Sequence, residues 1–190
     1  GERIITESNF NKGTSKTVFS CVRYGNVINS TGSVFPLFID KIKNGKKIPL
    51  TSGDMTRFFI TPKGAVNLIF KAIKYGGGGE IFVPKLPSVK MDNLIFSLKK
   101  SYNTNNPVEI IGLRPGEKIH EQMINDAEAH RTYDFGNTFV ITSQIEKYQE
   151  YAYKYLKKSK KVKFDTYSSG DNVLKGEKLD QFISEIKPIF

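Results

Sequence analysis

Apolar residues recur along this chain in two alternating patterns, short strand-like runs and longer stretches at helical spacing. The run over 17–22 is rich in β-branched and aromatic residues and predicts a buried strand. After it, Val34, Leu37, Phe38 and Ile42 recur at helical spacing as far as a cap at 44–45, which predicts a helix. Strands alternating with helices are typical of an α/β fold.

The same patterns continue to the end of the chain. Extended pieces are predicted at 46–51, 80–84 and 108–113, the first at a sheet edge because Pro49 cannot donate to a ladder. Thr61 and Pro62 start a helix that stops at Tyr75; apolar residues surround most of its circumference, so we expect it to be buried. Further predictions are helices at 88–98 (capped by Ser88), from Glu117 through Ile124, at 144–158 and at 177–186, and irregular, partly extended chain at 126–143.

The composition is that of a folded globular chain with one sizeable core. The chain has 190 residues, of which 38% are hydrophobic and 25% charged, too apolar for a disordered protein. No apolar run approaches the roughly 20 residues of a membrane span, and no signal peptide opens the chain. The single cysteine, Cys21, excludes an internal disulfide framework, and with only two histidines argues against zinc. The net charge of +10 suits anionic partners, nucleic acid among them.

A loop of small polar residues joins the first strand to the following helix. The loop ends at Ser33, a favourable N-cap residue. Free backbone N–H groups and the helix dipole converge at such a helix start, which favours a phosphate or pyrophosphate ligand. An ordinary joint between a strand and a helix is the alternative.

Two arginines are further candidates for anion binding. Arg57 lies within the apolar run 55–60, where a buried guanidinium needs either a ligand phosphate or a carboxylate such as Asp54. Arg114 follows the strand predicted at 108–113 and begins a tight turn before a predicted helix. It can donate to a phosphate, and Glu117 can accept from a diol. Both can equally be local turn residues, since the helix dipole favours Glu in a first turn.

Two other stretches invite a functional interpretation that their context opposes. The glycine run 76–79 follows a helix and precedes a strand, the wrong order for a dinucleotide-binding loop, so we interpret it as a flexible connection. Residues 154–163 hold six lysines among aromatic residues, a pattern compatible with nucleic-acid binding. Arginine is absent there and no nucleic-acid motif appears, which favours a solvated helix end.

Four motifs, in this order and approximate spacing, resemble one family. They are Arg23-Tyr24-Gly25-Asn26-Val27, Gly32-Ser33-Val34-Phe35-Pro36, Met55-Thr56-Arg57-Phe58-Phe59 and Leu113-Arg114-Pro115-Gly116-Glu117-Lys118. The chain resembles the polysaccharide-biosynthesis branch of the extended short-chain dehydrogenase/reductases, the UDP-N-acetylglucosamine 4,6-dehydratases (inverting or retaining). The closing Tyr167-Ser168-Ser169, with Asn172 and Leu174, is similar to that family's tail, so the resemblance covers nearly all of the chain.

The resemblance covers only the C-terminal half of the family's length. It implies an α/β fold made of the last Rossmann strands and the substrate-binding subdomain, with residues 1–190 as a single substrate-binding portion. The glycine-rich loop and the catalytic Tyr-x-x-x-Lys helix are expected upstream of Gly1, and residues 1–8 read as the end of a helix whose start is missing. The resemblance therefore implies no catalytic residue and no metal site in this chain, and no turnover by the chain alone.

The resemblance also implies roles for individual residues. Arg57 would hold the pyrophosphate, Ile48 would line the uracil pocket, and Tyr24 and Val27 would contact the cofactor, Val27 near the nicotinamide. This sequence has Asn29-Ser30-Thr31 where many relatives have Gly-Ser-Arg, which leaves the sugar open. The full set of implied substrate contacts is Asn26, Thr31, Gly32, Ser33, Val34, Phe35, Ile48, Arg57, Arg114, Pro115, Gly116 and Glu117.

The family's chemistry sets the expected activity and partners. It oxidises C4 of the hexose with tightly held NADP, eliminates water across C5 and C6, and returns the hydride to C6. We expect the chain to bind UDP-N-acetylglucosamine, to need an N-terminal half in cis or trans that binds most of the NADP, and to form a homo-oligomer in the cytoplasm. The alternatives are a non-catalytic UDP-sugar-binding module and, less favoured, a nucleic-acid-binding protein.

Overall fold

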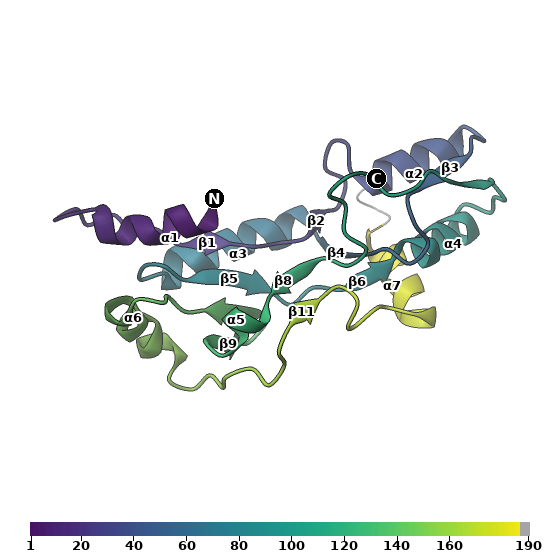
Figure 1. The fold of residues 1–190 in the computed structure, drawn as a ribbon. Coiled ribbons are helices and arrows are strands. Elements are labelled where there is room, and N and C mark those ends of the chain that lie inside the picture. The colour runs from purple at the N-terminus through teal and green to yellow at the C-terminus, as the bar shows by residue number, and fades with distance from the viewer. Residues whose placement is uncertain (187–190) are drawn as a thin grey trace. The chain divides into compact units, whose positions relative to one another are not determined.

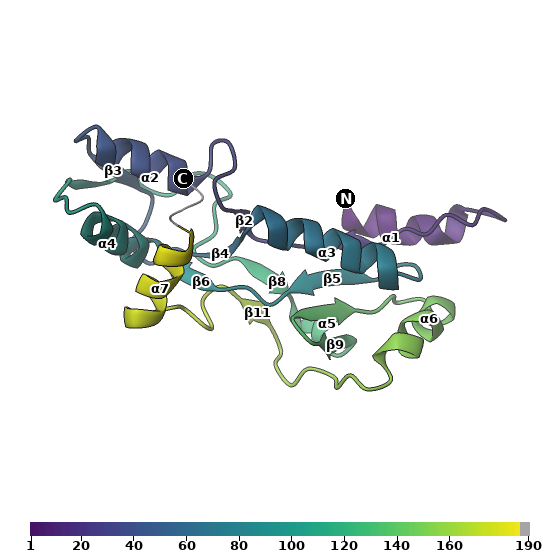
Figure 2. The ribbon, with the colours of Figure 1, turned by 180° about the vertical axis from the view of Figure 1, so that it is seen from behind.

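The computed structural model describes residues 1–186, which divide into two compact units (Figure 1; Figure 2 shows the reverse side). The first unit comprises Gly1–Tyr24, Lys63–Lys85 and Met123–Tyr167, and the second comprises Gly25–Pro62, Leu86–Gln122 and the chain from Ser168 onward. Within residues 1–186, no helix combines the length and apolarity that crossing a membrane requires.

The first unit is built on a four-stranded sheet of order β1-β5-β10-β9. Its wholly buried strand β5 (Ile81–Pro84) pairs parallel with β1 (Cys21–Val22) and antiparallel with β10 (Thr138–Ile141), which pairs in turn with β9 (Thr132–Phe135). The helices of this unit are α1 (Glu2–Asn11), α3 (Pro62–Tyr75), α5 (Asp126–Ala129) and α6 (Glu146–Leu156). Leu68 of α3, Phe82 and Val140 of the sheet, and Ala152 and Leu156 of α6 form one apolar cluster, so both helices pack on the sheet.

The second unit has two small sheets. In the first, β4 (Thr56–Ile60) lies between the parallel strand β2 (Asn26–Val27) and the antiparallel strand β6 (Ser88–Lys90). In the second, β3 (Ile48–Leu50) runs parallel to β7 (Val108–Ile110). The core between them includes Phe35, Phe59, Leu94 and Leu179, and the helices are α2 (Val34–Lys43), α4 (Met91–Ser101) and α7 (Gly176–Ile186). Elsewhere in the chain, β8 (Gln122–Ile124) pairs with β11 (Tyr167–Ser168).

Most of the strongly patterned elements are confirmed. The helices predicted after Ser33, Thr61, 144 and 177 are α2, α3, α6 and α7, and the chain does open in a helix, α1. The predicted strand at 17–22 is reduced to Cys21–Val22. Pro49 lies in a two-stranded sheet, in which each strand is an edge, as predicted.

The helix predicted from Glu117 through Ile124 is wrong. Those residues form an irregular stretch with a bend at 119–120, followed by β8. Their backbone bonds to distant segments: Thr56 N–H donates to the Ile119 carbonyl (2.9 Å), and Glu121 N–H donates to Ser169 Oγ (2.8 Å). These long-range hydrogen bonds replace the i to i−4 bonds of a helix, so helical spacing of apolar residues was misleading here.

Two neighbouring predictions also need correction. Ser88 does not cap a helix; it lies in β6, its Oγ donates to the Ser169 carbonyl, and α4 begins at Met91. The segment 126–143, expected to be irregular and partly extended, forms α5 and the antiparallel pair of β9 and β10. A turn at Gly136, whose φ is +70°, joins these two strands.

Helix α3 is not buried around its circumference, contrary to the prediction. Ala65 and Leu68 are buried, and Leu68 packs in the apolar cluster with the sheet. An apolar stripe at i, i+3, i+4 and i+7 is exposed: Val66 is 48% exposed, Ile69 42%, Phe70 64% and Ile73 72%. The first unit covers only one face of this helix.

Candidate functional site

The loop between β2 and α2 has the geometry that the sequence predicted for a helix start. Ser30 N–H donates to the Val27 carbonyl (3.2 Å), and Ser33 N–H to the Ser30 carbonyl (3.0 Å). Positive φ angles at Asn29 (61°) and Gly32 (75°) close the turns. Ser33 occupies the N-cap, but its side chain makes no capping bond; its buried Oγ finds no hydrogen-bond partner among residues 1–186. The Ser33 hydroxyl group, at the start of α2, is therefore able to donate a hydrogen bond to a ligand.

The predicted contacts in and near this loop differ in accessibility. Thr31 and Gly32 are exposed, and Ser33 and Val34 are half-buried. The Phe35 ring is wholly buried and packs edge-on against Phe59, with ring centroids 5.0 Å apart. Ile48 is wholly buried in the same core. The accessible part of the predicted site is thus 31–34, whereas the Phe35 and Ile48 side chains lie in the core.

Asn26 is fixed by a carboxylate that the sequence did not single out. Its Nδ2 donates to the Phe58 carbonyl and to Glu121 Oε1, both at 3.1 Å, and Phe58 N–H donates to Glu121 Oε2 (3.0 Å). Gly25 permits the close approach of these strands, since a Cβ there would lie 2.4 Å from the Phe58 carbonyl oxygen. Glu121 therefore ties the predicted ligand Asn26 to β4.

Arg57 is brought together with Glu117 and Glu121. Its side chain is 12% exposed, and Nη1 donates to the carbonyls of Thr56 (2.7 Å) and Ile119 (3.2 Å). Nη2 lies 3.6 Å from Glu117 Oε1, and Nε lies 3.7 Å from Glu121 Oε1. The guanidinium thus meets carboxylates, one of the two alternatives; Asp54 instead pairs with Lys90 (2.9 Å). Because 3.6–3.7 Å exceeds hydrogen-bond length, these N–H groups are only loosely held.

The turn at Arg114 forms without the helix expected to follow it. Glu117 N–H donates to the Arg114 carbonyl (3.0 Å), and Arg114 N–H donates to Glu117 Oε2 (3.2 Å). Gly116 adopts a φ of +79°, and Arg114, Pro115 and Gly116 are exposed. This turn therefore offers an exposed cation and a half-buried carboxylate, with no helix dipole to assist anion binding.

Three polar side chains to which the sequence analysis gave no individual role support this cluster. Thr56 Oγ1 lies 2.8 Å from His120 Nδ1 and 2.7 Å from Ser169 Oγ, which in turn accepts from Glu121 N–H. The chain brings these residues together across 113 positions, so no local pattern could have found them. In the part of the chain that the structure describes, no three His, Cys, Asp or Glu residues are grouped as metal ligands.

In the first unit, the glycine run is occupied by an internal carboxylate. Gly77 and Gly78 N–H groups donate to Glu80 Oε1 (2.8 Å) and Oε2 (2.7 Å), and Glu80 is wholly buried. The run connects α3 to β5, as the sequence predicted, and offers no cradle to a dinucleotide pyrophosphate. Of the predicted cofactor contacts, Tyr24 is 42% exposed and Val27 is half-buried.

Arg23, within the first predicted motif, has a structural role. Its guanidinium donates to Glu128 through Nη1 (2.8 Å) and Nη2 (2.7 Å), to Glu2 through Nε (2.7 Å), and to the Met123 carbonyl (2.6 Å). Burial acts to raise the pKa of Glu128, but the hydrogen bonds from Arg23 and the Asn125 N–H, together with the charges of Arg23 and Arg131, hold that pKa below its ordinary value. This network joins α1, β8 and α5.

Comparisons with known proteins agree with the motifs. A family model described as "Polysaccharide biosynthesis protein" matches residues 1–143. The UDP-N-acetylglucosamine 4,6-dehydratase (inverting) of Campylobacter jejuni subsp. jejuni serotype O:2 is 37% identical over 179 residues, which cover 91% of this chain and 52% of that protein. A UDP-glucose 4-epimerase of Rickettsia bellii is 41% identical over 126 residues, or 66% of this chain and 37% of that protein.

A solved structure supports the fold class. Pen from Bacillus thuringiensis aligns with a TM-score of 0.84 at 34% identity, over 97% of this chain and 54% of that one. The expected fold, part of an extended short-chain dehydrogenase, is thereby confirmed. This chain spans about half the length, or less, of the proteins that it matches.

Proposed function

We propose, on the premise that this chain belongs to the polysaccharide biosynthesis protein family, that it is the substrate-binding portion of a sugar-nucleotide dehydratase. Its substrate is UDP-N-acetylglucosamine, and the reaction is a 4,6-dehydration in the cytoplasm. The similarity to the Campylobacter dehydratase supports this choice. The similarity to the Rickettsia epimerase supports the same class of substrate with a different outcome at C4.

The observation that carries the proposal is the loose pairing of the Arg57 guanidinium with its carboxylate neighbours. A nearly buried guanidinium has its Nε and Nη2 3.6–3.7 Å from carboxylates, too far for good hydrogen bonds. A diphosphate accepts from the same groups at hydrogen-bond length and in the bidentate manner that suits arginine. Ser33 Oγ, buried without a partner among residues 1–186, adds a second donor within the same unit.

We expect most of the NADP cofactor to be bound by an N-terminal half and not by the residues of this chain. NADP supplies the hydride transfers, and this chain contributes Tyr24 and Val27 beside the nicotinamide. An N-terminal half, in cis or in trans, binds the remainder and brings the acid and base groups. The residues of this chain bind and orient the sugar nucleotide.

Calorimetric titration with UDP-N-acetylglucosamine, UDP and UMP tests the site. We expect binding that needs the diphosphate and that weakens about ten- to a hundredfold in Arg57→Ala, because charge-assisted hydrogen bonds contribute about 1.5–3 kcal/mol. Arg3→Ala is the matched control, since Arg3 lies in the first unit and its side chain is 88% exposed.

Two results contradict the proposal. Equal affinity for UMP and UDP, unchanged in Arg57→Ala, removes the diphosphate site. Robust turnover of UDP-N-acetylglucosamine with NADP by this chain alone contradicts the need for another half. Each variant is first checked for a cooperative thermal transition, so that loss of folding is not read as loss of binding.

A non-catalytic UDP-sugar-binding module is the second candidate. It is favoured by one observation: the contacts that fix Asn26, Arg57 and Glu117 come entirely from segments of the second unit. The two candidates differ when a chain carrying the glycine-rich loop and the Tyr-x-x-x-Lys helix is added. Turnover on mixing supports the dehydratase, and binding without turnover supports the module.

A further inference from the structure

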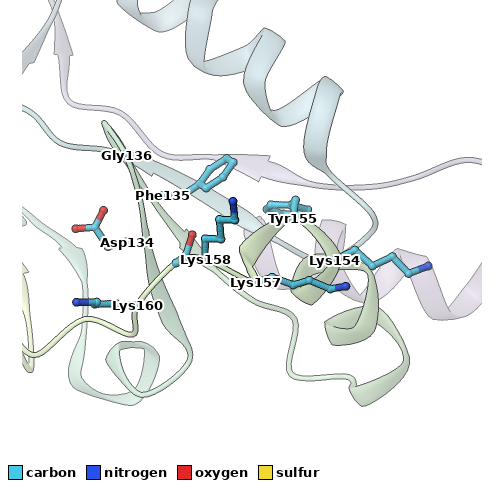
Figure 3. A pocket seen from close by; sticks show the side chains of 9 residues that line it. Asp134, Phe135, Gly136, Lys154, Tyr155, Lys157, Lys158 and Lys160 are labelled. Atoms are coloured by element: carbon cyan, nitrogen blue, oxygen red, sulfur yellow. The ribbon is translucent and has the colours of Figure 1, made fainter.

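A wide cavity in the first unit is lined by residues that take no part in the proposed sugar-nucleotide site. It has a volume of about 670 Å³ and is lined by Asp134–Gly136, Lys154, Tyr155 and Lys157–Lys160 (Figure 3). The rings of Tyr75, Phe135 and Tyr155 pack together beside it, with centroids 5.1–5.4 Å apart. The cavity thus has an aromatic wall and a lysine rim.

The rim is part of a larger basic patch, which we define as the six lysines at 154, 157, 158, 160, 161 and 163. All six are exposed, and within residues 1–186 none of them forms an ion pair. The carboxylate of Asp134, which lines the cavity, is paired with Lys85 (2.7 Å). The nearest acidic residues along the chain are Glu146 and Glu150 in the earlier turns of α6 and Asp165 just after Lys163, so the six lysines keep a net positive charge.

The lysine side chains do not converge on one point. In Figure 3, Lys158 points toward the rings of Phe135 and Tyr155, and Lys154 and Lys157 extend together to one side. Lys160 lies on the opposite side, below Asp134 in this view. A site for a single small anion needs donors that meet at that anion. Diverging cations match an extended array of negative charges instead.

Exposed tyrosines accompany the patch on α6. Tyr151 is 49% and Tyr153 42% exposed, and Lys154 Nζ lies 4.8 Å from the centre of the Tyr151 ring. A phenol ring is apolar with a polar tip, which suits the headgroup layer of a bilayer. Of the patch, Lys154 lies in α6 and the other five lysines follow the end of that helix. A dense cluster of lysines of this kind attracts anionic lipids. No arginine follows Arg131, so the side chain best suited to reading and stacking on bases is missing.

We propose that the basic patch, with Tyr151 and Tyr153, is a peripheral docking surface for an anionic lipid bilayer. The binding is independent of the sugar-nucleotide site, because no residue is shared. Each lysine near such a surface contributes about a fivefold gain in affinity, so the whole patch accounts for strong but salt-sensitive attachment.

Vesicle co-sedimentation tests this surface with the purified protein. We expect binding to vesicles of phosphatidylcholine mixed with phosphatidylglycerol, and little binding to phosphatidylcholine alone. The triple substitution Lys157→Gln, Lys158→Gln, Lys160→Gln is expected to weaken binding about a hundredfold. The matched control is Lys43→Gln, Lys46→Gln, Lys178→Gln, which removes the same charge from three exposed lysines of the second unit.

A second variant separates docking from general charge attraction. Tyr151→Ser with Tyr153→Ser leaves the net charge unchanged and is expected to weaken vesicle binding several-fold. Equal loss in the patch and control triples overturns the proposal in favour of net charge. The proposal is also overturned if a single-stranded oligonucleotide binds more tightly than the vesicles and through the same lysines. Equal binding to the two kinds of vesicle overturns it as well. Thermal melting of each variant confirms that the protein is folded.

Discussion

At the scale of single residues, Glu121 joins three parts of the candidate site. Its carboxylate accepts from Asn26 and from the Phe58 N–H, and it lies 3.7 Å from Arg57 Nε. Its own N–H is held by Ser169. The position of Asn26, a predicted ligand, therefore depends on a residue more than ninety positions away in the chain.

Removing this carboxylate is expected to destabilise the protein. Glu121→Ala leaves the Phe58 N–H without its acceptor, which costs about 1–3 kcal/mol in the free energy of unfolding. Urea denaturation measures the loss. Glu109→Ala is the control, since Glu109 forms an exposed ion pair with Lys47 worth at most about 1 kcal/mol. Equal losses would show that Glu121 does not organise the site.

Glu128 gives the stability of the first unit a pH dependence. Burial raises its folded-state pKa, but the combined effect of Arg23, the Asn125 N–H and Arg131 holds that pKa below the ordinary 4.5, so the unfolded chain takes up the proton more readily. The stabilisation is present above about pH 4.5 and is lost as the pH falls through the folded-state pKa. We expect Glu128→Gln to be less stable at neutral pH and to lose less stability on acidification. Urea denaturation of both proteins over pH 3–7 measures this difference. The control is Glu150→Gln, an exposed residue, for which we expect the stability to vary with pH as it does in the wild type.

At the scale of elements, the sequence predicted what local patterns determine. The start of α2 at Ser33, the start of α3 at Pro62 and the edge position of Pro49 follow from the chemistry of single residues, and they are confirmed. The helix expected at 117–124 failed because its backbone bonds to Thr56 and Ser169, which are distant in sequence. Likewise, the demand of Arg57 for an anionic partner was predictable, but Glu121 as one of its partners was not.

Substitutions in helix α3 test whether its apolar stripe is exposed in solution. Because Phe70 and Ile73 are exposed, Phe70→Ser with Ile73→Ser is expected to change the free energy of unfolding by about 0.5 kcal/mol or less per site. Leu68→Ala, on the buried face, is expected to cost about 2–5 kcal/mol. Both are measured by urea denaturation. A double variant as unstable as Leu68→Ala would mean that the stripe is covered in solution.

At the scale of the whole molecule, the candidate contacts fall almost entirely within the second unit. Of the predicted set, only Tyr24 belongs to the first unit, which instead holds the Arg23 network and the basic patch. The family match runs through both units, from residue 1 to 143, whereas the patch lies beyond it. The recognised motifs and the proposed lipid-binding surface are therefore separable by mutation.

The interleaving of the two units also constrains how the protein is made. Each unit is assembled from three separate segments, so the chain passes from one to the other at residues 24, 62, 85, 122 and 167. Neither unit can therefore be expressed as one continuous segment of the sequence. On the ribosome, the second unit cannot close its core until α7, with Leu179 and Ile183, has emerged. The early motifs that carry the candidate site thus lack part of their core until the chain has been made as far as α7.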